Sequence, residues 1–173
     1  MEIKINLDKI KRTIEIADSG VGMSKQEMIE NLGTIARSGS KAFMEQYQDQ
    51  DTADPNAIIG QFGVGFYSAF MVADKIEVFS QSCEAGSAGY HWESDGTGTY
   101  TIAETEGVEE GTKVIIHLKE DCSEFADYNK VREIIKKYSS FVGSTLFLDG
   151  NQANDLRPGK NLGPLIHLDS EDI

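Results

Sequence analysis

The chain has 173 residues and a formal net charge of −13, from 29 acidic and 16 basic residues. Its length fits one domain of ordinary size, and a composition of 39% hydrophobic and 26% charged residues is typical of a globular protein. The acidic balance argues against nucleic-acid binding and against binding to an anionic membrane, because both need a broad basic face. One local anion site built from backbone N–H groups is still compatible with it.

Cysteine usage and the N-terminal residues indicate an intracellular protein. Cys83 and Cys122 form neither a CxxC motif nor a paired framework, and no apolar run approaches 18 residues. The chain starts directly in strand pattern, without a signal peptide or an Arg-rich presequence. We therefore expect a cytoplasmic protein, or a mitochondrial-matrix protein whose N-terminal part is absent.

The first third of the chain predicts a strand hairpin followed by helices. Apolar residues alternate in 3–7 and in 14–16, with a polar turn between them. Ser24 and Glu27 form a capping box, so we expect a helix from Ser24 to a stop near Gly33. A short helix over 41–47 and a polar loop over 48–56 should follow.

The remainder predicts an apolar helix opened by three glycines and then a group of strands. The strands are expected at 75–81, 89–94, 99–103 and 112–118, as an antiparallel meander. A helix capped by Ser123 should run to about residue 140, followed by a strand at 145–148 and a linker from about residue 150. Strands and helices cluster separately, which favours an α+β fold, a two-layer sandwich, over an array of βαβ units.

Asp18-x-Gly20-x-Gly22 is the first candidate binding motif. Glycines let the backbone turn sharply and approach a ligand, and an ionised carboxylate can only accept hydrogen bonds, which suits a ligand amine such as that of adenine. An ordinary Asx-turn after a strand is the alternative explanation.

Gly60-x-x-Gly63-x-Gly65 is the second candidate motif. A glycine-rich turn at a helix N-terminus presents free N–H groups that can bind phosphate. The spacing is neither a Walker A loop nor a dinucleotide fingerprint. Close helix packing is the alternative reason for these glycines.

Thr112 and the segment from Asn31 to Lys41 are weaker candidates. The Thr112 hydroxyl could bind a ligand directly or through water, although threonine is also simply a good strand former. Asn31, Arg37 and Lys41 could meet a polyphosphate, or could belong to a solvated loop.

Residues for metal binding and for nucleophilic catalysis are not recognised. His91, His117 and His167 lie far apart in sequence, and no pair has helical metal-ligand spacing with a carboxylate. There is no GxSxG motif. We therefore assign neither a metal ligand nor a catalytic residue.

Together, DSGVGM, NLGTIARSGSKAF and GQFGVGFYSAFMVAD resemble the N-terminal ATP-binding domain of the heat-shock protein 90 chaperones, in the gyrase–chaperone–histidine kinase–MutL ATPase superfamily. The resemblance covers about residues 2–149 and is nearest to the mitochondrial branch, then the bacterial branch. It implies a Bergerat-type sandwich with a mixed, mostly antiparallel sheet that has helices and a lid, about residues 33–66, on one face.

The resemblance also implies a role for each matching residue in binding ATP or ADP. Asp18 would accept the adenine amine, with Gly22 and Thr112 completing the base contacts. Met23 and Leu32 would form apolar walls, and Asn31 would lie near the ribose and phosphates. The lid would be formed at one end by Arg37, Ser38 and Gly39, and at the other by Gly60, Gly63, Val64, Gly65 and Phe66.

The chain departs from the family pattern before the first strand. The family places a helix there that carries the general-base Glu and the Asn that holds Mg²⁺, and no residue of this chain matches either role. We therefore expect an N-terminally truncated domain that binds nucleotide weakly and hydrolyses little, with residues 150–173 as a linker or the start of a middle domain.

The implied parent is an ATP-dependent chaperone that acts on unfolded or partly folded client proteins and dimerises through other domains. A non-catalytic adenine-nucleotide-binding or interaction module is the alternative. A histidine kinase catalytic domain is a third and weaker one.

Overall fold

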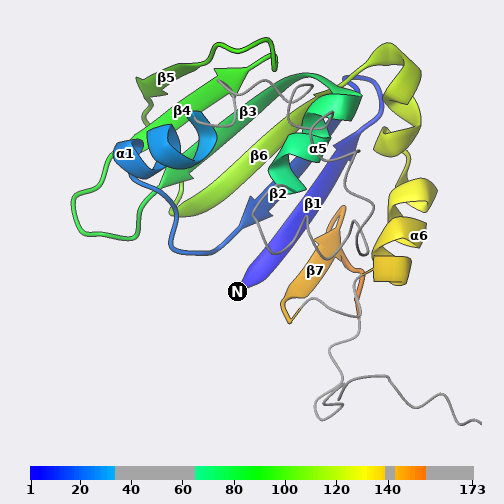
Figure 1. The fold of residues 1–173 in the computed structure, drawn as a ribbon. Coiled ribbons are helices and arrows are strands. Elements are labelled where there is room, and N and C mark those ends of the chain that lie inside the picture. Colours follow the sequence, from blue (N-terminus) through cyan, green and yellow to red (C-terminus); the bar gives the residue numbers. More distant parts are fainter. Residues whose placement is uncertain (34–64, 139–142, 155–173) are drawn as a thin grey trace, which may run out of the picture.

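A mixed eight-stranded sheet is the main feature of the fold (Figure 1). The structure is a computed structural model, and it describes residues 1–33, 65–138 and 143–154. Its strands are β1 (Glu2–Asp8), β2 (Thr13–Asp18), β3 (Ala73–Gln81), β4 (Gly89–Ser94), β5 (Thr101–Glu104), β6 (Gly111–Leu118), β7 (Thr145–Leu148) and β8 (Asn151–Gln152). Their order is β5-β4-β3-β6-β2-β1-β7-β8, and neighbours are antiparallel except β1 and β7. The predicted α+β class is confirmed.

Helices pack against the sheet in two clusters. The helices are α1 (Lys25–Met28), η1 (a π-helical turn, Ile29–Gly33), α5 (Gly65–Val72), η2 (a 3₁₀ helix, Glu120–Ala126) and α6 (Tyr128–Tyr138). Met28, Leu32 and Phe70 join the core over β3, β4 and β6, and α6 packs over β1 and β7 in a second cluster (Figure 1). No helix in the described residues is long and apolar enough to cross a membrane.

Alternation along each strand gives the sheet two different faces. In β3, Ile76, Val78 and Ser80 are buried beneath the helices. We call this side the covered face. Glu77 and Phe79 point to the opposite side, which we call the open face, because the described helices pack against the other one.

The N-terminal predictions agree closely with the structure. The hairpin forms β1 and β2, and Ser24 caps α1 with the complete capping box, Ser24 accepting from the Glu27 amide and Glu27 accepting from the Ser24 amide. Beyond residue 33 the expected helix over 41–47 and loop over 48–56 lie outside the described residues.

The predicted meander is wrong for its last strand. β3, β4 and β5 are consecutive neighbours, but β6 pairs with β3 and β2 rather than with β5. β6 therefore joins the meander to the hairpin. The connection from β5 to β6 skips β4 and β3, which lie between them in the sheet. Adjacency of strands in sequence does not determine this order; the shared apolar face of Val114, Ile116 and Ile16 favours it.

Two further differences concern the C-terminal part. Ser123 does not cap a long helix: it lies inside η2, and Asp127 caps α6 by accepting from the amides of Asn129 and Lys130. The chain also forms β8 after the expected end of the domain. Asn154 is buried there and bonds the Leu146 amide and the Ser144 carbonyl.

Candidate functional site

A row of three polar residues crosses the covered face where β2 ends. Strand register aligns Asp18 of β2 with Thr112 of β6, and Thr112 with Ser80 of β3. The next row inward on the same face is apolar, with Ile16, Val114 and Val78 in register. We call the first three residues the polar row. An apolar floor that ends in a polar row suits a flat ring with polar groups at one edge.

Asp18 has one oxygen engaged and one available. Its Oδ1 accepts a hydrogen bond from the Gly20 amide at 2.8 Å, which is the Asx-turn considered above. No donor to Oδ2 is found among the described residues. The turn and a ligand contact are therefore compatible, because the turn fixes the carboxylate and leaves its second oxygen free to accept.

Ser80 links the turn to the strands, and the sequence analysis missed it. Its side chain is fully buried and its Oγ accepts from the Met23 amide at 2.9 Å, donates to the Gly111 carbonyl at 2.8 Å and contacts Thr112 Oγ1 at 2.9 Å. A serine hydroxyl has one hydrogen. Since that hydrogen goes to Gly111, Thr112 is the donor in their contact, and no described residue donates to its lone pairs. The sequence does contain a sign of this role: Ser80 continues the alternation of buried residues that Ile76 and Val78 begin.

Gly22 and Gly111 allow the backbone to close around this network. Both have positive φ, +65° and +107°. A Cβ at Gly22 would lie 1.9 Å from the Gln81 carbonyl oxygen, and one at Gly111 would lie 2.3 Å from the Asp18 carbonyl oxygen. The Asp18–Met23 turn can therefore lie against β3 and β6 only with glycine at these positions.

The predicted apolar residues lie on the same face as the polar row. Met23 is partly buried against the main core, and Leu32 belongs to it. Phe66, predicted for the far end of the lid, is also partly buried against that core. Phe66 makes edge contacts with the rings of Phe70 and Trp92, both at 5.9 Å between centroids. Asn31, by contrast, is exposed on η1.

The second glycine motif is described only where its helix begins. α5 starts at Gly65 and packs on the covered face, the face that also carries Asp18. The other predicted lid residues lie outside the described residues: Arg37, Ser38, Gly39, Gly60, Gly63 and Val64.

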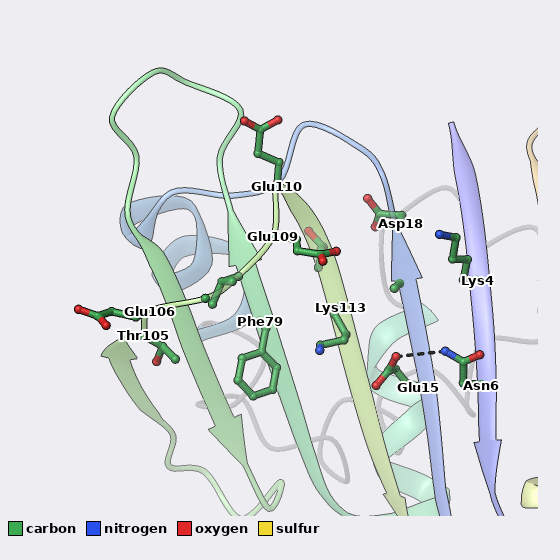
Figure 2. Close-up of a pocket in the computed structure, with 14 residues that line it drawn as sticks. Lys4, Asn6, Glu15, Asp18, Phe79, Thr105, Glu106, Glu109, Glu110 and Lys113 are labelled. Atoms are coloured by element: carbon green, nitrogen blue, oxygen red, sulfur yellow. Dashed lines mark hydrogen bonds between the residues drawn. The ribbon is translucent and has the colours of Figure 1, made fainter.

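A cavity of about 450 Å³ opens at the same sheet end but on the open face (Figure 2). It reaches Asp18 and Thr112 at the strand ends, and the Thr105–Glu110 connection forms one wall. Its floor carries Glu15, which accepts from Asn6 at 3.2 Å, and Lys113 (Figure 2). The cavity therefore shares Asp18 and Thr112 with the candidate site, but the side chains on its floor alternate away from the polar row and belong to the open face.

Comparison with known proteins gives a consistent result. Residues 1–129 match the family model described as histidine kinase-, DNA gyrase B-, and HSP90-like ATPase. The mitochondrial heat shock protein 75 kDa of Bos taurus is 57% identical over 157 residues, which are 91% of this chain and 22% of that protein.

Two other relatives agree with that match. The mitochondrial TNF receptor-associated protein 1 homolog of Dictyostelium discoideum is 52% identical over 91% of this chain and 22% of its own length. The chaperone protein HtpG of Desulfitobacterium hafniense is 49% identical over 91% of this chain and 26% of its own length. The chain thus spans about a quarter of the length of these relatives.

Proposed function

The chain belongs to the histidine kinase-, DNA gyrase B- and HSP90-like ATPase family, as an ATP-binding domain of the heat-shock protein 90 type, and from this we propose that the polar row binds the adenine of ATP or ADP. The observation that carries the proposal is the pair of free acceptors at the ends of β2 and β6. Asp18 Oδ2 and the Thr112 hydroxyl oxygen lie in one register row.

Two acceptors side by side select the edge of a purine. An exocyclic amine has two N–H donors and can satisfy such a pair, directly or through water. A ring with a carbonyl oxygen in that position would bring one acceptor against another, because the Asp18 carboxylate cannot donate a hydrogen bond. An unpaired buried polar group costs about 1–3 kcal/mol. We therefore propose that the site prefers adenine to guanine and hypoxanthine.

The remaining assigned residues complete the proposed binding mode. Met23 and Leu32 form the apolar side of the base site, and Gly22 lets the turn approach the ring. Asn31 lies toward the ribose and phosphates. The segment from Arg37, Ser38 and Gly39 to Gly60, Gly63, Val64, Gly65 and Phe66 acts as the lid over the phosphates. The family's Mg²⁺ ion has no ligand assigned in this chain, so the proposal includes no step through it.

Beyond nucleotide binding, we propose that this domain serves an ATP-dependent molecular chaperone. The named relatives are a heat-shock protein and a chaperone, which supports unfolded or partly folded proteins as clients. A homodimer formed through other domains is the working form in this proposal. The sequence identity of this chain is 57% and 52% to the two mitochondrial relatives and 49% to the bacterial one. That difference supports a mitochondrial location over a cytoplasmic one.

Titration calorimetry of ADP binding to Asp18→Asn tests the base contact. The asparagine oxygen can still accept from Gly20 and keep the turn, but its amide group replaces the free acceptor with a donor. We expect binding to weaken by about 1–3 kcal/mol, or roughly 5- to 150-fold.

Asp95→Asn is the matched control for this experiment. Asp95 Oδ1 accepts from the Thr97 amide at 3.0 Å in the same kind of turn, in an exposed loop away from the polar row. ADP affinity should be unchanged in this variant. Equal affinity of wild type and Asp18→Asn would remove Asp18 from the site.

A further inference from the structure

Strand register gathers five charged or titratable side chains on the open face, on β3, β4 and β6. Glu77 of β3 is mostly buried, with 16% of its side chain exposed. His91 comes from β4, His117 from β6 and Lys75 from β3. The two histidines are 26 residues apart in sequence, yet both reach the carboxylate of Glu77.

Each histidine uses a different oxygen of that carboxylate. His91 Nε2 lies 3.0 Å from Glu77 Oε1, and His117 Nε2 bonds Oε2. Glu93, two residues along β4 from His91 and directly across from Glu77, has its Oε2 4.0 Å from the same Nε2. One imidazole nitrogen is thus flanked by two carboxylates, and ligand atoms of Glu77, His91 and Glu93 all lie within 4.8 Å of one another.

We propose that Glu77, His91 and Glu93 form a binding site for a divalent transition-metal ion of the zinc class. Zinc bonds of about 2.0–2.2 Å to nitrogen and oxygen in tetrahedral geometry separate neighbouring ligand atoms by roughly 3.3–3.5 Å. The observed separations from His91 Nε2, 3.0 and 4.0 Å, bracket that value. Three protein ligands leave the fourth position for water.

A cation already lies between the two carboxylates. Lys75 Nζ is 3.7 Å from Glu77 Oε2 and 3.5 Å from Glu93 Oε2. Its side chain is 41% exposed, so it can turn into solvent and vacate the place. A recess of about 330 Å³ lined by Lys75, Glu93 and Thr101, among others, adjoins the group and gives an ion access to it.

Neighbouring residues hold the proposed ligands in place. His117 bonds the Glu77 oxygen that faces away from His91, as outer partners of metal-bound carboxylates commonly do. The Phe79 ring stacks on His91, with 4.3 Å between centroids and 6° between planes, which fixes the imidazole plane.

Entry of the ion would replace one hydrogen bond. His91 Nε2 bonds Glu77 Oε1 at 3.0 Å. Because an imidazole nitrogen that binds a metal carries no proton, the proton in that bond would leave to solvent as the ion enters.

Calorimetric titration with Zn²⁺ alone tests the proposal. Cys83→Ser and Cys122→Ser should be present in every protein measured, because thiolates also bind zinc. We expect one saturable site. His91→Gln should weaken it more than about 100-fold, beyond the 10- to 100-fold range typical of outer partners, and His117→Ala should weaken it about 10-fold.

Two further variants separate a metal site from an ion-pair network. Lys75→Gln should tighten Zn²⁺ binding several-fold, because it removes the competing ammonium group; a purely structural cluster predicts no such gain. Glu15→Gln, a carboxylate elsewhere on the open face, should leave the affinity unchanged. Circular dichroism confirms that each variant is folded. Absence of saturable binding, or equal affinity in the cysteine-free parent, His91→Gln and Lys75→Gln, would overturn the proposal.

Discussion

The two faces of β3 carry polar residues that are stabilised in opposite ways. On the covered face Ser80 is fully buried, neutral, and saturated by Met23, Gly111 and Thr112. On the open face Glu77 is charged and held by two histidines and a lysine. Two residues of one strand, three positions apart, thus serve a hydrogen-bond network and an ion-pair network.

The difference shows how burial sets the chemistry that a strand can offer. Beneath helices an unpaired charge is costly, so the covered face uses hydroxyls and backbone groups in fixed geometry. Beside water, charges remain solvated in part and their pairing contributes little to stability. A change on the covered face should therefore cost much more stability than a comparable change on the open face.

Gly22→Ala should give the largest effect. The new Cβ would lie 1.9 Å from the Gln81 carbonyl oxygen at a φ of +65°. Overpacking against backbone and the left-handed conformation together should cost roughly 3 kcal/mol of unfolding free energy, measured in urea. Gly86→Ala is the control, since its φ is +83° but nothing lies within 4 Å; it should cost about 1 kcal/mol. Equal losses of unfolding free energy in the two variants would mean that the close approach at Gly22 does not affect stability.

Ser80→Ala should follow, with a loss of about 2 kcal/mol, because it strips the Met23 amide and the Gly111 carbonyl of a buried partner. Urea unfolding measures this loss. Ser19→Ala provides the comparison: Ser19 is exposed and accepts one hydrogen bond from Glu2 at 3.1 Å, so its loss should stay within about 0.5 kcal/mol. A Ser80→Ala protein as stable as the Ser19→Ala protein would contradict the network.

Glu77 should give the smallest effect, and one that depends on pH. Its folded-state pKa is held below the unfolded value by His117, Lys75 and His91 against the opposing effect of burial, and Glu93 lies nearby. The resulting stability is therefore complete above the unfolded-state pKa and is lost as pH falls through the folded-state pKa.

Urea unfolding of wild type and Glu77→Gln between neutral and acidic pH measures that contribution. The difference between the two proteins should shrink as pH falls. A difference that stays constant, or widens, would show that the carboxylate's charge is not what stabilises the open face.

Sequence patterns predicted the covered face better than the open face. Alternating apolar residues defined β1, β2 and most other strands, and the Ser24–Glu27 box located the start of α1. These signals are local. The position of β6 beside β3, the role of Ser80 and the partners of Glu77 all depend on strand register, which joins residues distant in sequence.

The histidines illustrate that limit most clearly. The sequence spacing of His91 and His117 fits no metal-binding motif. They meet at Glu77 only because β4 and β6 both flank β3. Asp18 was easier to recognise, since its turn, its glycines and its strand are contiguous.

Amide NMR spectra recorded with ADP and with inosine diphosphate, which lacks the exocyclic amine, test the central claim most directly. The account predicts that ADP shifts the amides of Gly22, Met23 and Thr112 on the covered face, leaves Glu77 and His91 unaffected, and binds much more tightly than the inosine nucleotide. Equal binding of the two nucleotides, or shifts confined to the open face, would contradict it.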